Sequence, residues 1–149
     1  MRRLLLAMLG LLLTLGAQAD DGLVVAQSAH SVAETLNRFA RAAEAKGMKI
    51  FARIDHAAGA EAAGMPLPAT ELLIFGNPRI GTTLMRSNRR IGVDLPLKAM
   101  AWQDEAGAVW LAFPDPATLL ERYGISDQAP IAAKMTQALA GFALQATAP

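Results

Sequence analysis

The stretch from Thr70 to Gly124 decides the fold: TELLIFGNPRIGTTLMRSNRRIGVDLPLKAMAWQDEAGAVWLAFPDPATLLERYG. It contains two runs in which apolar residues alternate, 95–101 and 109–113, on either side of a DEAG sequence at 104–107. Alternation with a period of two predicts strands, and a glycine-containing turn between them predicts a β-hairpin. A third compact apolar run, residues 71–75, is expected to be another strand of the same sheet.

Two helix starts lie within this stretch. Asn77-Pro78 and Asp115-Pro116 each pair a capping side chain with a proline at the first helical position, where a missing N–H costs nothing. They predict short helices from residue 78 to about residue 88 and from residue 116 to residue 123, the second ending at Gly124.

The N-terminal flank adds a strand at residues 22–27 and a longer helix. Ser31 and Glu34 have the spacing of a capping box, in which Glu34 reaches back to the cap. Val32, Leu36, Phe39 and Ala43 then recur on one face, and Gly47 suits the end of this helix.

The rest of the chain supplies one more strand, a loop and a final helix. Residues 48–55 alternate as a strand with one face more polar than the other. Residues 56–69 (HAAGAEAAGMPLPA) are expected to be a loop with at most a helical turn. A C-terminal helix over 127–145 carries one apolar stripe. We therefore predict an α+β fold: a single two-layer domain with about five strands, mainly antiparallel, and helices packed on one face.

Residues 1–19 have the layout of a cleaved signal peptide. Arg2 and Arg3 precede an apolar stretch from Leu4 to Leu15, and Ala17-Gln18-Ala19 gives the small residues of a cleavage site. The apolar stretch is shorter than the roughly 20 residues of a membrane span. We expect a periplasmic domain over 20–149, without stable membrane insertion after cleavage.

Composition excludes several function classes. Without residues 1–19, 12 Lys and Arg stand against 13 Asp and Glu, which argues against a nucleic-acid binder. The chain has no cysteine, so disulfides, thiol nucleophiles, iron–sulfur clusters and thiolate zinc sites are excluded.

The stretch from Thr70 to Gly124 closely resembles the core of a bacterial family, the domain of unknown function 302 family. The resemblance extends over about residues 21–125 and is strongest from Ile54 onward. It implies a fold and no activity. It also implies that a sequence like IDHAAG at residues 54–59 recurs in exported members of the family.

His56 is the strongest single candidate for a catalytic or ligand-binding residue. It ends a strand, follows Asp55 and opens the small-residue segment, so it could act as an oriented general base or as a ligand-binding group. Alternatively it only caps a turn, because neighbouring strand residues point to opposite faces. With His56 and Asp55 we group Asn77 and Glu71 as candidate ligand-binding residues, around a pocket between residues 56–69 and the Asn77 turn.

A metal site is not predicted. His30 could lie near His56, with Glu71, Asp94 or Met65 completing a set, but no metal-binding spacing supports this. The methionines fall at positions typical of core filling. No catalytic motif or cofactor fingerprint is present, and GNPRIG at 76–81 is only a weak phosphate-binding candidate.

Two surfaces could bind partners. Arg79, Arg86, Arg89 and Arg90 form a basic cluster that is either a solvated face or a site for an anionic small molecule or anionic lipid. The strand positions expected to point away from the core hold Phe51, Trp102 and Trp110. If these side chains share a face of the sheet, a second subunit could cover it, giving a homodimer.

Three function classes follow from these observations. We favour a non-enzymatic periplasmic domain that binds a small ligand or acts as an accessory, because no set of nucleophile, base and orienting group can be assembled. The alternatives are an enzyme with His56 as acid–base residue, and a structural or assembly role as a homodimer.

Overall fold

The structure, a computed structural model, describes residues 21–149. These residues form five strands, five α-helices and one 3-10 helix. In chain order the elements are β1 (Leu23–Ser28), α1 (Val32–Ala45), β2 (Lys49–Asp55), α2 (His56–Ala62), β3 (Thr70–Gly76), α3 (Pro78–Ser87), η1 (Arg89–Val93), β4 (Leu97–Gln103), β5 (Val109–Pro114), α4 (Pro116–Arg122) and α5 (Ala129–Thr147). The signal peptide predicted at residues 1–19 lies outside the described residues.

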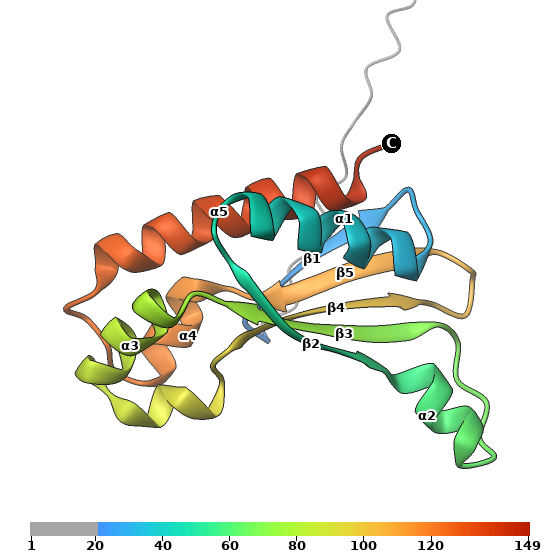
Figure 1. Cartoon of the computed structure of the whole chain (residues 1–149), viewed down its shortest axis with the longest axis horizontal. Helices are drawn as coiled ribbons and strands as arrows, with labels where there is room; N and C mark the ends of the chain where they lie inside the picture. The colour runs from blue at the N-terminus through green and yellow to red at the C-terminus, as the bar shows by residue number, and fades with distance from the viewer. Residues whose placement is uncertain (1–20) are drawn as a thin grey trace, which may run out of the picture.

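The strands form one antiparallel sheet in the order β1-β5-β4-β3-β2 (Figure 1). The predicted hairpin is β4 and β5, where Trp102 pairs with Trp110. Helices α1 and α5 pack against each other on one side of the sheet. The prediction of an α+β fold with a five-stranded antiparallel sheet is confirmed.

The core lies between the sheet and these two helices. The four residues predicted on one face of α1 are all buried, and Phe39 is fully so. The Phe39 ring lies 5.1 Å from that of Phe75 on β3, 6.2 Å from that of Phe113 on β5 and 5.7 Å from that of Phe142 on α5, measured between centroids. A single aromatic cluster therefore connects both layers.

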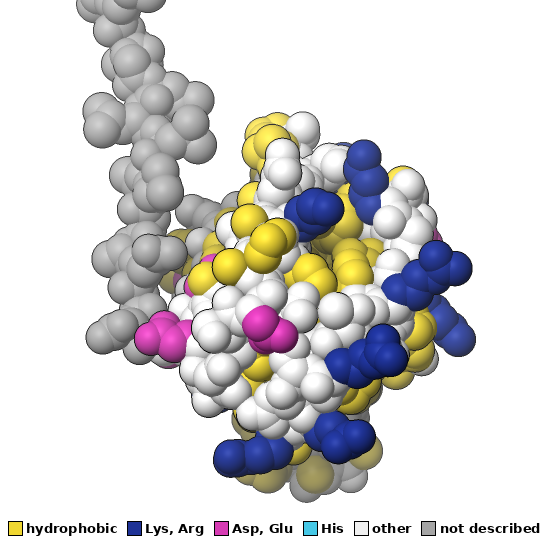
Figure 2. Space-filling model, turned by 90° about the vertical axis from the view of Figure 1, so that its left-hand side faces the viewer, with side chains coloured by type: hydrophobic (Ala, Val, Ile, Leu, Met, Phe, Trp, Pro, Cys, Tyr) yellow, Lys and Arg dark blue, Asp and Glu magenta, His cyan; other side chains and the backbone are white. Residues whose placement is uncertain are grey.

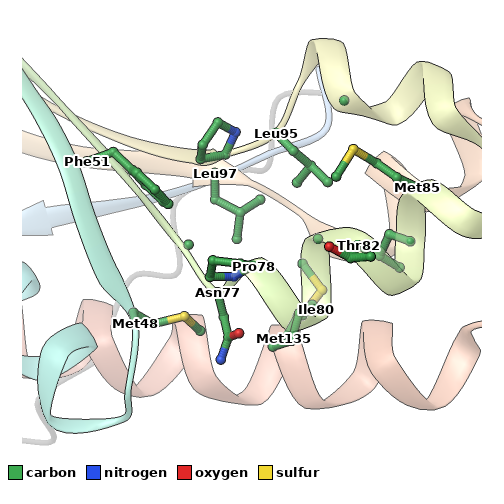
Figure 3. Close-up of a pocket in the computed structure, with 15 residues that line it drawn as sticks. Met48, Phe51, Asn77, Pro78, Ile80, Thr82, Met85, Leu95, Leu97 and Met135 are labelled. Atoms are coloured by element: carbon green, nitrogen blue, oxygen red, sulfur yellow. The ribbon is translucent and has the colours of Figure 1, made fainter.

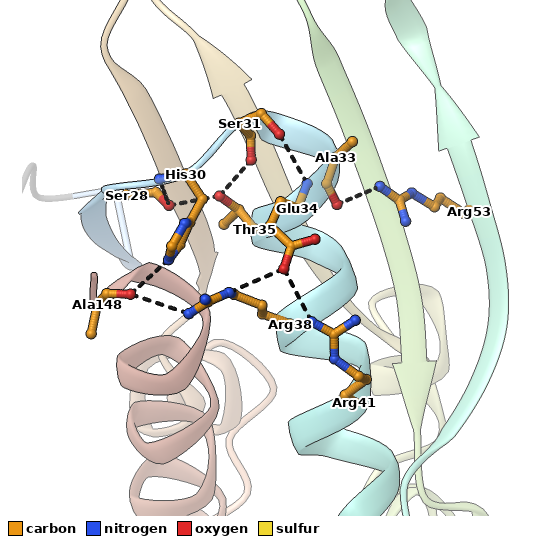
Figure 4. Close-up of polar contacts among 10 residues, drawn as sticks. All are labelled: Ser28, His30, Ser31, Ala33, Glu34, Thr35, Arg38, Arg41, Arg53 and Ala148. Carbon is orange, nitrogen blue, oxygen red and sulfur yellow. Dashed lines mark hydrogen bonds and ion pairs between the residues drawn. The ribbon is translucent and has the colours of Figure 1, made fainter.

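The start of α1 follows the predicted cap in part (Figure 4). The Ser31 hydroxyl accepts a hydrogen bond from the Glu34 backbone N–H at 3.2 Å, as expected. The Glu34 carboxylate, expected to reach back to the cap, instead accepts from Arg38 and Arg41, each at 3.1 Å. The hydrogen bond from Arg38 is the main reason that the pKa of Glu34 is lowered. The carboxylate binds the guanidinium groups in preference to the cap N–H because they are charged donors on the same helix face.

The C-terminal helix closes against the loop before α1. His30 Nε2 lies 2.6 Å from the carbonyl oxygen of Ala148, and Arg38 donates to the same oxygen at 3.3 Å (Figure 4). Met135, Leu139 and Phe142 of α5 are buried, so the C-terminal helix is part of the core.

Residues 56–69 differ from the predicted loop, because their first half is the helix α2. The Asp55 side chain caps this helix by accepting from the Ala58 N–H at 2.8 Å. Alanine-rich sequence favours helix once a cap is available. No α2 residue is buried, so the helix projects from the end of the sheet (Figure 1).

The opposite face of the sheet carries apolar side chains. Trp102 and Trp110 share this face as predicted, since they are directly paired. Phe51 lies at a register irregularity between Ile50 and Ala52, and its ring approaches Gly76 instead. In Figure 1 no described helix crosses this face.

Candidate functional site

An apolar cavity lies where β3 passes into α3. It is bounded by α3 and η1 on one side, by the end of β2 nearest α1 on another, and by α5 below (Figure 3). Its volume is about 330 Å³. It is lined by Met48, Phe51, Gly76, Asn77, Pro78, Ile80, Gly81, Thr82, Leu84, Met85, Gly92, Leu95, Pro96, Leu97 and Met135.

The strand-to-helix turn at Gly76-Asn77-Pro78 builds one wall. The Asn77 side chain caps α3 by accepting from the Arg79 N–H at 2.9 Å, and Pro78 occupies the first turn. Both features were predicted from the sequence. The cap fixes the angle at which α3 leaves the sheet and so leaves space beside it.

Glycines keep the cavity open. A Cβ at Gly81 would lie 3.8 Å from Leu95 Cδ1, and one at Gly76 would lie 3.6 Å from Pro96 Cβ. These are ordinary van der Waals separations, so a methyl group fits at either position, and because both residues line the cavity a larger side chain would take up part of its volume.

The lining of the cavity is almost entirely apolar. Asn77 and Thr82 are the only lining residues with polar side chains, and none of the lining residues is titratable. Three methionines meet here: Met48 from the residue just before β2, Met85 from α3 and Met135 from α5 (Figure 3). Methionine is flexible and polarisable, so it adapts to irregular apolar ligands. The sequence reasoning placed these methionines in the core and missed that the fold gathers them.

The other predicted ligand residues lie at the opposite end of β3. In the antiparallel β2–β3 pair, Asp55 is opposite Glu71, whereas Gly76 is opposite Lys49. Five residues of strand separate Glu71 from Gly76, which is about 17 Å. The structure therefore brings Asp55, His56 and Glu71 to one end of the sheet and Asn77 to the other.

Each residue of that distant group has a local environment of its own. Asp55 caps α2, and Glu71 accepts from Arg53 Nε at 2.6 Å. His56 is exposed, and within residues 21–149 no hydrogen bond holds its ring. A shallow second hollow beside α2 is lined by Asp55 but not by His56.

The residues considered for a metal site, which the sequence did not predict, are also dispersed. His30 contacts Ala148, Glu71 contacts Arg53, and Asp94 accepts from Arg122 and from the Tyr123 hydroxyl. Residues 21–149 contain no group of three His, Cys, Asp or Glu side chains arranged to hold a metal ion.

The arginine cluster lies on the same two elements as the cavity wall. Arg79 and Arg86 belong to α3, and Arg89 and Arg90 belong to η1. Figure 2 shows the end of the molecule where α3 lies, with dark blue side chains around exposed yellow ones.

Asp94 raises the pKa of Tyr123, mainly through its hydrogen bond, while Arg122 and Arg90 act in the opposite direction.

Comparison with known proteins gives the family relationships. The family model described as "Domain of unknown function DUF302" matches residues 24–142. The crystal structure of an uncharacterized conserved protein DUF302 from Bacillus stearothermophilus superposes with a TM-score of 0.76 over 85% of this chain and 98% of that chain, at 18% identity. That likeness shows the fold.

Some relatives of this chain carry a functional name. The chain is 53% identical over 119 residues to the fluoride-specific ion channel FluC 1 of Brucella suis biovar 1 (strain 1330) and to FluC 2 of Brucella melitensis biotype 1. The match covers 78% of this chain but only 47% and 44% of those proteins, so the chain spans less than half their length. Among residues 21–149, no helix is long and apolar enough to cross a membrane.

Proposed function

The chain belongs to the DUF302 family, and from that premise we propose that it is a non-enzymatic accessory domain that binds a small, mainly apolar ligand. The observation that carries the proposal is the cavity of about 330 Å³ with only two polar side chains in its lining. Ligand pockets are typically apolar, with a few polar groups that orient the ligand, and start at about 300 Å³.

The lining supports binding over catalysis. General acid–base chemistry needs a titratable group within hydrogen-bond reach of the substrate, and no such group lines this cavity. The Asn77 Oδ1 is occupied as a helix cap, which leaves the Asn77 amide N–H groups and the Thr82 hydroxyl to orient a ligand.

The accessory role is supported by the Brucella relatives. In those proteins a segment 53% identical to this chain makes up less than half of a protein named as a fluoride-specific ion channel. A domain joined to a channel in one bacterium is a candidate to act beside a membrane transport protein in another. We propose the periplasm as the place of this activity, which the signal peptide expected at residues 1–19 supports.

A neutral apolar fluorescent probe tests the binding function. We expect N-phenylnaphthylamine to bind the purified protein with a rise in fluorescence, and Gly81→Met to abolish that rise because the new side chain enters the cavity. Gly141→Met is the matched control, because Gly141 is also helical and a Cβ there meets nothing within 4 Å. Probe binding that survives Gly81→Met unchanged, in a protein that remains folded, would contradict the proposal.

We also propose that the open face of the sheet pairs with a second copy of the chain. Trp102, Trp110 and the β4 residue Met100 lie on this face, away from α1 and α5. Five strands about 4.8 Å apart and about 20 Å long give a flat face of roughly 500 Å². The side chains that project from the face increase its accessible surface. A stable dimer buries about 800 Å² of accessible surface on each partner, so the whole face and the relief of its side chains would be needed.

Light scattering tests the homodimer. Met100 lies on the central strand β4, so Met100→Glu puts a charge near the middle of the face. We expect the wild type to have the mass of a dimer and Met100→Glu that of a monomer. Gln137→Glu, exposed on α5 at the other side of the sheet, is the control and should stay dimeric. A monomer mass for the wild type at high concentration refutes the dimer.

A further inference from the structure

The wall of the apolar cavity carries positive charge without matching negative charge. Residues 78–93 contain four arginines and no Asp or Glu. All four arginines are exposed. Within residues 21–149, none of their guanidinium groups takes part in an ion pair or a side-chain hydrogen bond. Exposed guanidinium groups without a partner are well suited to bind carboxylates, sulfonates and phosphates.

Helical geometry places two of these arginines at the mouth of the cavity. Residues three and four apart lie on the same face of an α-helix. Arg79, Thr82 and Arg86 follow that spacing on α3. Thr82 lines the cavity and is itself exposed, so it lies at the edge (Figure 3). The two arginines therefore flank the edge of the cavity, one turn to either side.

A third arginine follows from the geometry of η1. In a 3-10 helix, side chains three residues apart eclipse each other. Arg89 and Gly92 are three apart, and Gly92 lines the cavity. Arg90 lies on another face, near Tyr123.

The nearby carboxylates are already engaged. Asp94 accepts from Arg122 and from the Tyr123 hydroxyl. Asp127 accepts from the hydroxyl of Ser87 at the end of α3 at 2.9 Å. Neither is paired with the three arginines on the cavity side, so a bound anion would not have to displace an existing partner.

We propose that the ligand is an amphiphile whose single apolar chain fills the cavity and whose anionic head group is held by Arg79, Arg86 and Arg89. This rests on the proposed function, since it requires that the cavity binds an apolar group. The cavity has the volume of about eleven waters at about 30 Å³ each. That is room for one alkyl chain of medium length.

Displacement of N-phenylnaphthylamine by ligands with the same tail tests the head group. Decanoate, decanol and decyltrimethylammonium, each below its micelle concentration, share a decyl-length chain and differ in charge. We expect decanoate to bind at least about fivefold more tightly than decanol, and the cation to bind most weakly. Added salt should reduce the preference for decanoate, because it screens exposed charges. Acetate, which has the head group alone, should not displace the probe.

Arginine variants identify the binding groups. Arg79→Gln combined with Arg86→Gln should remove the preference for decanoate and leave decanol binding unchanged. The matched control removes the same charge from α1 and its C-cap, with Arg41→Gln and Lys46→Gln, and should keep the preference. Arg89→Gln should weaken decanoate binding, whereas Arg90→Gln, one residue away on another face, should not.

The outcomes separate this inference from the proposed function. Equal binding of decanoate and decanol by the wild type, or the same loss of preference in the α1 control, overturns the anionic head group and leaves apolar binding intact. If no decyl compound displaces the probe, or if Gly81→Met leaves probe binding unchanged, both the apolar binding site and the anionic head group are refuted.

Discussion

Phe39 connects four elements of the core, so its replacement tests how the domain is held together. Its side chain is fully buried in α1. Its ring contacts three others, at centroid distances of 5.1 Å to Phe75, 6.2 Å to Phe113 and 5.7 Å to Phe142. Two of these contacts are edge-to-face, with interplanar angles of 70° and 80°, the arrangement that aromatic pairs prefer.

The size of the effect follows from these contacts. Each aromatic pair contributes about 0.5–1.5 kcal/mol beyond the burial of its area. Leucine keeps most of the apolar burial but loses all three ring pairs, so Phe39→Leu should lower the free energy of unfolding by about 2 kcal/mol. Phe39→Ala also leaves a cavity and should cost about 4 kcal/mol. That is a large part of the roughly 5–15 kcal/mol that stabilises a typical domain.

Urea denaturation followed by circular dichroism measures this loss. With a slope of about 2 kcal/mol per molar urea, Phe39→Leu should lower the midpoint by about 1 M. Phe51→Leu is the control, because that ring is 44% exposed, and its midpoint should change by no more than about 0.3 M. Equal midpoint shifts in the two variants would show that the ring cluster does not hold the two layers together.

Two further predictions concern turns. The Asp104 carboxylate has a lowered pKa, chiefly because Trp110 Nε1 donates to it at 2.8 Å. Its stabilising effect is therefore present above the ordinary aspartate pKa and is lost as the pH falls through the lowered value, so the melting temperatures of wild type and Asp104→Ala should differ at neutral pH and converge in acid. Gly47 has a φ of +78°, where a Cβ is strained, so Gly47→Ala should lower the free energy of unfolding by about 1 kcal/mol in urea denaturation, whereas Gly141→Ala, at an ordinary helical position, should not lower it.

The sequence predicted those parts of the fold that local patterns determine. The period of two in residues 95–113 gave the β4–β5 hairpin, and the stripe on α1 gave its buried face, because each pattern has one arrangement that buries its apolar side chains. The caps at Ser31, Asn77 and Asp115 were predicted from a side chain and the residues just after it, and all three accept the expected backbone N–H.

Long-range placement accounts for what the sequence did not predict. His56 and Asn77 both flank a strand, and nothing local shows that β3 carries them to opposite ends of the sheet. The meeting of Met48, Met85 and Met135 also depends on how α3 and α5 lie against the residue just before β2. Glu34 was expected to complete the cap, but Arg38 and Arg41 compete for its carboxylate, and such competition between partners cannot be judged from spacing alone.

Gly81 gives a physical reason to regard the cavity as a site and not as imperfect packing. It lies inside α3, where glycine costs about 1 kcal/mol relative to alanine. Its backbone does not require glycine, since its φ is not positive, and an added Cβ would meet Leu95 only at 3.8 Å. Alanine would therefore improve the helix and fill space, both of which favour stability. A residue that breaks the local rule at the wall of a cavity is what a binding site requires, because local rules are broken where function needs room.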